Sequence, residues 1–138
     1  MDDIETKLNR YQSQILSILR IMFGLLFLQA GLVKWFGFPV ANPNFANIQL
    51  FSLYGIAGII ETVGGVLVAV GLFTRYAAFI MSGEMAVAYF LMRTGAGKAF
   101  APIANGGNLE IAFCFVFLYL VFAGAGPWSL DAVLRKRG

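Results

Sequence analysis

The sequence predicts an all-α membrane protein, a bundle of four transmembrane helices with both termini on the inner side and a short interfacial helix at the C-terminus. Of its 138 residues, 59% are hydrophobic and 12% are charged, and the mean hydropathy is +0.78, so a soluble domain would have too little polar surface to cover itself. Four apolar stretches approach the length of about 20 residues that a helix needs to cross a bilayer. They leave little other chain, so we expect one transmembrane domain over residues 1–138, with spans at about 15–32, 53–73, 76–92 and 109–126.

The orientation is predicted from the lysine and arginine residues near the ends of the spans, because these residues are enriched in cytoplasmic segments. The inner six are Lys7, Arg10, Arg75, Arg135, Lys136 and Arg137, and the outer three are Lys34, Arg93 and Lys98. This bias favours a topology with both termini inside. The basic C-terminal tail then suits an anionic lipid leaflet, and the net charge of +3 requires no nucleic-acid partner.

The first span follows an acidic segment at residues 2–5 and precedes three further spans, so we expect a retained helix and not a cleaved signal peptide. The polar residues before it read as an interfacial lead-in. At about 100° per residue, one face of this helix carries two cations and two glycines. Its members are Arg20, Gly24, Phe27, Gly31 and Lys34. We therefore expect Arg20 to face other helices, whereas Lys34 either anchors the outer end at the interface or takes part in a site.

The second span carries a carboxylate, Glu61, in its middle. An ionisable group in hydrocarbon is costly, and it normally faces the bundle interior, meets a partner or marks a ligand or proton path. Gly55, Gly58 and Gly65 share its helix face, and small residues let neighbouring backbones approach closely. We therefore expect this face to point at other helices and not at lipid.

The third span carries Glu84, and only Thr74 and Arg75 separate it from the second span, which predicts a tight antiparallel hairpin. At about 1.5 Å per residue, Glu84 and Arg20 lie at nearly the same depth, so we expect them to form an ion pair. Glu61 would then lack a strong cation near the midplane, and as a neutral acid it could donate a hydrogen bond or pass on a proton. The alternative is that Glu61 shares Arg20 or bonds to helix backbone. We take Arg20, Glu61 and Glu84 as a candidate internal polar site.

A second candidate site lies on the outer side, where a glycine-rich loop at residues 93–108 leads into the fourth span. The free amides of a helix N-terminus can bind an anionic or carbonyl group, and capping by Asn105 or Asn108 is the alternative use. Glu110 follows in the first turn, where the helix dipole favours a carboxylate. After this span the chain leaves the bilayer at Pro127 and begins a short amphipathic helix. The candidate outer-side residues are Lys34, Arg93, Asn105 and Glu110.

The sequence contains no histidine and a single cysteine, Cys114. These counts exclude haem ligation by histidine, the usual histidine-based metal sites, an intramolecular disulfide and an iron–sulfur cluster. We therefore expect no haem, iron–sulfur or zinc centre in this chain. Any redox reaction would use a cofactor that a partner protein supplies.

Several short motifs occur in order from about Arg20 to the C-terminal tail. They are Gly31-Leu-Val-Lys34, Glu61-Thr-Val-Gly-Gly, Gly71-Leu-Phe-Thr-Arg75, Gly83-Glu84-Met85, Ala88-Tyr89-Phe90, Asn105-Gly106-Gly107 and Gly124-Ala-Gly-Pro-Trp-Ser129-Leu130-Asp131. With this order and spacing the chain resembles the DoxX family of small four-helix bacterial membrane proteins. The resemblance implies a four-helix bundle in the bacterial inner membrane, an association with quinone-linked redox systems, and a non-covalently bound quinone.

The chain departs from the family pattern at two positions. Members often carry a histidine after the Ala-Tyr-Phe segment and a glutamate directly after Asn-Gly-Gly. Arg93 and Asn108 stand there in this sequence, so no role that depends on that histidine or glutamate carries over.

Three functions agree with these observations. The first is a quinone-associated membrane subunit of a redox system. In it the internal polar site binds a carbonyl group or a proton, and a partner protein supplies the cofactor. If the chain is an enzyme, it is a quinone-linked oxidoreductase subunit of this kind. The second is a non-catalytic scaffold or accessory subunit, whose buried charges fix the helix register. The third is a small-molecule or proton permease, which with four short helices would have to act as a homo-oligomer.

Overall fold

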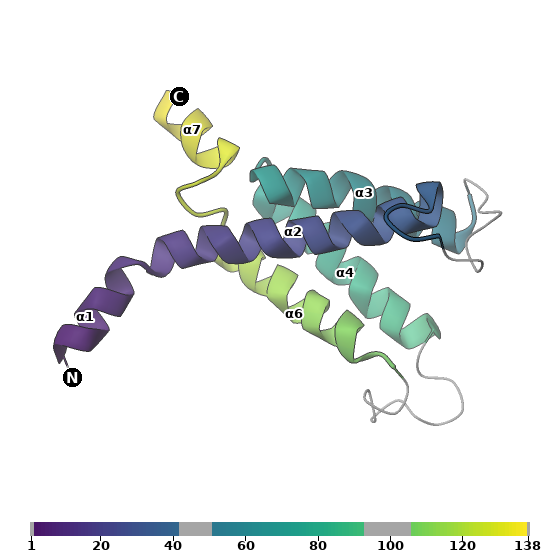
Figure 1. The fold of residues 1–138 in the computed structure, drawn as a ribbon, viewed down its shortest axis with the longest axis horizontal. Coiled ribbons are helices and arrows are strands. Elements are labelled where there is room, and N and C mark those ends of the chain that lie inside the picture. The colour runs from purple at the N-terminus through teal and green to yellow at the C-terminus, as the bar shows by residue number, and fades with distance from the viewer. Residues whose placement is uncertain (1, 42–50, 93–105, 138) are drawn as a thin grey trace.

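The computed structural model describes residues 2–41, 51–92 and 106–137. Within these ranges every regular element is a helix, as the sequence predicts. The helices are α1 (Asp2–Arg10), α2 (Gln12–Phe36), α3 (Leu53–Val70), α4 (Thr74–Met92), α6 (Asn108–Ala123) and α7 (Leu130–Arg137) (Figure 1). α2, α3, α4 and α6 correspond to the four apolar stretches, and α7 to the predicted C-terminal helix.

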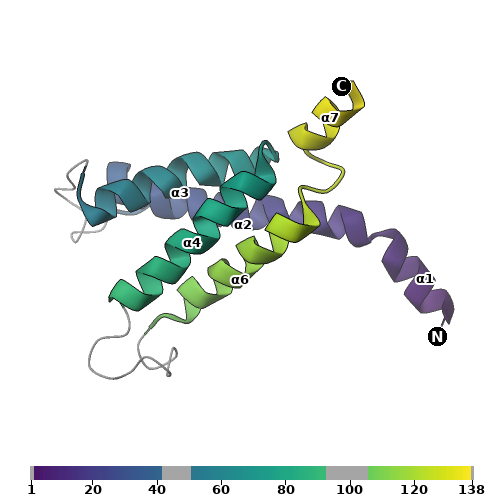
Figure 2. The same cartoon turned by 180° about the vertical axis from the view of Figure 1, so that it is seen from behind.

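The N-terminal segment is a helix of its own, where the sequence predicts only a polar lead-in. One residue, Tyr11, separates α1 from α2, and α1 points away from the other helices in both views (Figures 1 and 2). α2 is longer than the predicted span at both ends. It ends at Phe36 and is followed by Gly37, whose φ of 62° lies in the left-handed region. The Gly37 amide donates a hydrogen bond to the Val33 carbonyl, and the Phe38 amide donates one to the Leu32 carbonyl.

α3 and α4 form the predicted antiparallel hairpin, but the turn lies earlier in the chain than predicted. α3 begins after Ser52, whose hydroxyl oxygen accepts a hydrogen bond of 3.0 Å from the Gly55 amide, as an N-cap residue does. It ends at Val70 and is followed by Gly71, which takes the left-handed conformation with a φ of 76°. Thr74 is already the first residue of α4, so the turn consists of residues 71–73.

The four long helices pack as two pairs. α2 lies beside α3, and α4 lies beside α6, in both views (Figures 1 and 2). The two pairs are inclined to each other and are joined by the α3–α4 turn. Both chain termini lie toward the same end of the long axis, beyond α1 and α7 (Figure 1).

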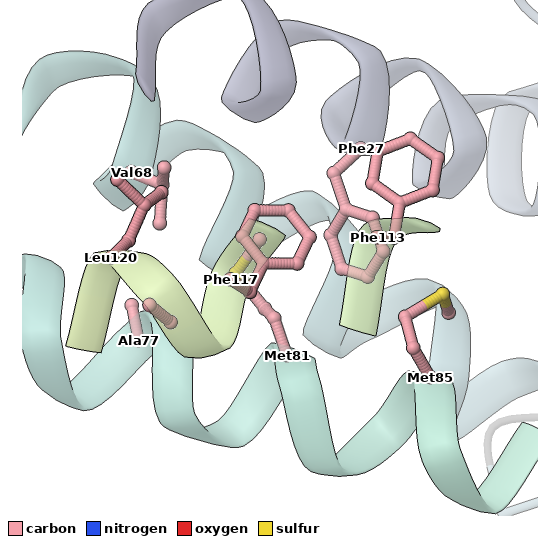
Figure 3. Close-up of a cluster of buried hydrophobic side chains, with 9 residues drawn as sticks. Phe27, Val68, Ala77, Met81, Met85, Phe113, Phe117 and Leu120 are labelled. Atoms are coloured by element: carbon pink, nitrogen blue, oxygen red, sulfur yellow. The ribbon is translucent and has the colours of Figure 1, made fainter. Parts of the chain in front are cut away.

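Aromatic side chains join the two pairs. Phe27 of α2 meets Phe117 and Phe113 of α6, with ring centroids 5.0 Å and 5.5 Å apart. Met81 of α4 and Val68 of α3 complete the contact among the four helices (Figure 3). Lipid tails are as apolar as these side chains, so in a bilayer the cluster stabilises the fold by close packing and ring geometry, with about 0.5–1.5 kcal/mol for each ring pair.

The outside of the helices is apolar, which suits contact with lipid. Large side chains such as Val63, Ile80 and Phe122 are 55%, 55% and 75% exposed. Within the described residues, α2 and α3 are long and apolar enough to cross a membrane, and α6 is apolar but has only 16 residues. The number of four spans stays a prediction.

Candidate functional site

A buried ion pair connects α2 and α3. Lys34 Nζ lies 2.8 Å from Oε1 and 2.6 Å from Oε2 of Glu61, so one ammonium group bridges both carboxylate oxygens. The two side chains are only 14% and 4% exposed. Removing either side chain would leave the other charge uncompensated in an apolar environment. Each buried charge therefore depends on the other for its stabilisation.

Close approach of the two helices makes this contact possible. A Cβ atom added at Gly31 would lie 2.6 Å from the Thr62 amide nitrogen, and one added at Gly65 would lie 2.6 Å from the Leu28 amide nitrogen. Real Cβ atoms do not approach a neighbouring backbone so closely, so only glycine allows this separation. The predicted glycine face around Glu61 is therefore confirmed as a helix contact.

Lys34 reaches into the bundle and not toward the interface. The Cα–Cβ bond of a helical residue tilts toward the N-terminus of its helix, so this side chain starts out directed back along α2. Its Cβ lies beside Gly58, three residues before Glu61 on α3, and the remaining length of the side chain brings the ammonium to the carboxylate. The contact is therefore with Glu61, a member of the candidate internal site, and not with the membrane interface.

Glu84 of α4 completes a group of three charged residues, which we call the charge cluster: Lys34, Glu61 and Glu84. The charges of Glu61 and Lys34 both act on Glu84. Its Oε2 atom is buried and has no hydrogen-bond partner among the residues that the structure describes. The charge cluster therefore combines one ammonium group, two carboxyl groups and one open position for a hydrogen bond.

Arg20 does not belong to this cluster, although it is buried as predicted, with 1% exposure. It donates hydrogen bonds to three carbonyl oxygens, those of Trp128 at 2.7 Å, Ala69 at 3.5 Å and Ala125. The predicted ion pair of Arg20 with Glu84 is therefore wrong, and so is the expectation that Glu61 lacks a cation. The acceptors lie at the C-terminal end of α3 and just after α6, where helix dipoles favour a cation, and the charge of Asp131 acts on Arg20 as well.

The ends of four helices meet around Arg20, in a region that we call the terminal junction. Asp131 of α7 caps α4 by accepting hydrogen bonds from the amides of Phe73 and Thr74, at 2.9 Å and 3.0 Å. Arg75 donates to the carbonyls of Val121 and Phe122 at the end of α6, both at 2.8 Å. These contacts satisfy backbone groups that helix ends leave open. Two of the sequence motifs, residues 71–75 and 124–131, thus have a structural role that their residue types alone do not disclose.

The outer-side site stays a prediction. Two of its members, Arg93 and Asn105, lie outside the described residues. A third, Lys34, belongs to the charge cluster. Glu110 lies half-buried in the first turn of α6. The N-cap residue of α6 is Gly107, without a side-chain hydrogen bond, so the predicted capping by Asn108 is wrong.

The charge cluster can bind a polar group but has no metal-binding set. In the described parts of the chain, no three histidine, cysteine, aspartate or glutamate side chains are grouped so that they could hold a metal ion. The ammonium group of Lys34 favours a negative or partly negative atom nearby. Glu84 can donate a hydrogen bond when it carries a proton and accept one when it does not. These properties suit an uncharged ligand with a carbonyl or hydroxyl oxygen.

Comparison with known proteins identifies relatives along most of the chain. The DoxX family model matches residues 15–94, which include most of α2 and all of α3 and α4, and therefore the whole charge cluster. An uncharacterized protein of Haemophilus influenzae is 43% identical over 94% of this chain and 98% of its own length. An uncharacterized membrane protein of Mycobacterium tuberculosis is 30% identical over 86% of this chain and 80% of its own.

A third relative carries a functional name. A Bacillus subtilis protein named "Putative oxidoreductase CatD" is 29% identical over 86% of this chain and 86% of its own. No solved structure matches the chain significantly.

Proposed function

The chain belongs to the DoxX family of membrane proteins, and we propose that it is the membrane subunit of a quinone-linked redox system. In this proposal the charge cluster receives the head of a quinone from the bilayer, without a covalent bond. A redox partner protein supplies the electrons, because a chain with no histidine and one cysteine offers no ligand set for a haem or an iron–sulfur cluster. The name of the Bacillus subtilis relative, an oxidoreductase, agrees with this assignment.

The observation that carries the proposal is the buried Oε2 atom of Glu84, for which the described parts of the chain offer no hydrogen-bond partner. A buried polar atom left in this state costs about 1–3 kcal/mol, so native proteins usually satisfy it. A protonated Glu84 can donate to the carbonyl oxygen of a quinone, and an ionised Glu84 can accept from the hydroxyl of a quinol. Lys34 adds positive charge nearby, which favours the oxygen atoms of either form.

A non-catalytic accessory subunit is the second candidate, and the ion pair favours it. Lys34 and Glu61 lie between helices that glycine residues bring close together, where such a pair fixes the register of α2 against α3. This role requires both members of the pair. It does not require Glu84, which therefore separates the two candidate functions.

In this proposal the protein lies in the bacterial inner membrane with both termini in the cytoplasm. The two long apolar helices support a membrane location. The excess of lysine and arginine near the termini supports the orientation, and the position of both termini toward one end of the molecule agrees with it (Figure 1).

The proposal is tested by measuring quinone binding to the purified protein. The chain has two tryptophans, so a Trp128→Phe variant retains only Trp35. Trp35 flanks Gly58 together with Lys34 and is thus close enough to the charge cluster to report a bound quinone by loss of fluorescence. Solvent extraction and absorbance of the wild-type protein show whether it also retains a quinone from the cell.

Glu84→Leu in this background should weaken quinone binding about tenfold, because it removes the hydrogen-bonding group from the site. It should not lower thermal stability, because it also removes an unsatisfied buried atom. Glu5→Leu on the exposed α1 is the matched control and should bind as the parent does. Equal affinity in the parent and in Glu84→Leu would reject the quinone site and leave the accessory role.

A further inference from the structure

The N-terminal helix α1 lies apart from the helix bundle. It points away from the other helices in both views, and the side chains at residues 3–10 are exposed (Figures 1 and 2). The helix has only 9 residues, and isolated helices shorter than about 12–15 residues are marginal in water. Packing against the described parts of the bundle therefore contributes little to the stability of α1.

One face of α1 is apolar. Ile4, Leu8 and Tyr11 follow one another by four and three residues, so they lie on the same side of the helix, and they are 62%, 67% and 55% exposed. At about 100° per residue, Lys7 is the charged residue nearest to this face, and Thr6 lies nearly opposite to it. Large apolar side chains gathered on one exposed face mark an interaction surface.

The apolar face of α1 continues onto the lipid-facing side of α2. Ile15 and Ile18 follow Tyr11 by four and seven residues and are also exposed. From Ile15 to Phe36, α2 is about 33 Å long at 1.5 Å per residue, which is close to the thickness of the hydrocarbon core of a bilayer. The polar residues 12–14 then lie at the level of the lipid headgroups, and α1 starts from that level.

We infer that α1 lies along the membrane surface on the side of the chain termini, with Ile4, Leu8 and Tyr11 inserted into the boundary between headgroups and acyl chains. A phospholipid surface is apolar below and hydrated above, so it matches both faces of the helix. Tyrosine is enriched at this depth, and the ammonium group of Lys7 can extend to a lipid phosphate. The inference concerns the attachment of the protein to the membrane and does not depend on the proposed function.

A second copy of the chain fits this face less well. A coiled coil needs its apolar spacing over at least about three to four heptads of regular helix, whereas Tyr11 interrupts the helix here. Helices that associate within lipid meet through small residues, and the continuing face of α2 carries Ile15 and Ile18 instead.

The test measures the surroundings of spin labels on both faces of α1. Single cysteines are placed by Ile4→Cys and Leu8→Cys in a Cys114→Ser background, with Thr6→Cys and Asn9→Cys on the polar side as matched controls. The full chain is reconstituted in vesicles of phosphatidylethanolamine and phosphatidylglycerol. Oxygen, which concentrates in lipid, and a water-soluble nickel chelate are the two collision partners.

Labels at the two apolar positions should collide with oxygen severalfold more often than with the nickel chelate, and labels at the two control positions should show the reverse. Equal access of the nickel chelate to all four labels would overturn the inference, because α1 would then project into water. Shielding of the two apolar positions from both collision partners would also overturn it and indicate a protein contact. Broadening of the spectra that disappears on dilution with unlabelled protein would assign that contact to a second copy.

A second measurement keeps a large apolar side chain at every position of the face. Leu8→Trp is made in a Trp35→Phe and Trp128→Phe background, so its fluorescence is the only tryptophan signal. Lipids brominated on their acyl chains should quench this tryptophan, and Thr6→Trp in the same background should be quenched by aqueous iodide instead. Quenching of both tryptophans by iodide alone would reject the membrane contact.

Discussion

Lys34 and Glu61 stabilise each other, so replacing either one alone should lower the stability of the folded protein. Lys34→Met leaves a buried carboxylate and Glu61→Gln leaves a buried ammonium, and breaking a buried pair in this way costs about 3–5 kcal/mol in soluble proteins. The double variant leaves neither charge and should recover part of the loss. Thermal unfolding in detergent, followed by circular dichroism, measures all three.

Arg20 and Glu84 provide the matched control for this cycle. Because Arg20 is held by backbone carbonyls and not by Glu84, the effects of Arg20→Met and Glu84→Leu should add. Additive losses for Lys34 and Glu61, or a recovery in the Arg20 and Glu84 pair, would contradict the contacts described above.

The charged residues mark what the sequence could and could not predict about the site. Periodicity alone places Arg20, Glu61 and Lys34 on faces that meet other helices, and those faces are confirmed for Arg20 and Glu61 by their burial. The predicted pairing of Arg20 with Glu84 was wrong because the depth of a Cα atom in the membrane does not give the depth of the charge at the end of a long side chain. A lysine side chain spans about one helix turn and starts toward the N-terminus of its helix, which moves its charge away from the depth of its Cα. The carbonyls that hold Arg20 belong to helix ends, whose position depends on the folded chain.

At the level of the helices, glycine should matter only where a neighbour lies against it. A Cβ at Gly65 would meet the backbone of Leu28 at 2.6 Å, whereas one at Gly83 on α4 would meet nothing within 4 Å. Gly65→Ala should therefore push α2 away from α3 and destabilise the protein by about 1–3 kcal/mol. Gly83→Ala should stabilise it by up to about 1 kcal/mol, because alanine favours the helix.

Thermal unfolding of the two alanine variants compares these effects directly. Both replace a glycine inside a long helix with the same residue, so helix propensity is matched between them. The same loss of stability in both variants would contradict the assignment of Gly65 to a close contact between α2 and α3.

The helix ends are fixed by contacts that connect distant parts of the chain. The Asp131 amide donates to the Gly71 carbonyl at 2.8 Å, while the Asp131 carboxylate caps α4, so α7 is tied to the α3–α4 turn by both its backbone and its side chain. Ser17 of α2 accepts a hydrogen bond of 3.2 Å from the Trp128 amide in the segment before α7. The terminal junction therefore holds together the end of the helix bundle that lies away from Lys34.

For the whole molecule, the sequence predicts the helices better than their arrangement. Apolar length and the scarcity of charge locate α2, α3, α4 and α6, and Gly37 and Gly71 end two of them with left-handed caps. The inclination of the pair α2 and α3 against the pair α4 and α6 was not predicted. This inclination depends on the helix faces that carry glycine and on those that carry phenylalanine. It results from the packing of several side chains at once, so no single residue predicts it.

The last prediction concerns the topology of the whole chain. Both termini lie toward one end of the molecule, as an even number of spans requires, and the basic residues favour the cytoplasm for that end (Figure 1). Single cysteines are placed by Asn42→Cys, Lys98→Cys and Arg135→Cys in a Cys114→Ser background; positions 42 and 98 lie outside the described residues. A membrane-impermeant maleimide should label positions 42 and 98 in intact cells, and position 135 only after the cells are permeabilised. Labelling of position 135 alone in intact cells would reverse the orientation, and labelling of 42 and 135 without 98 would contradict the four-span topology.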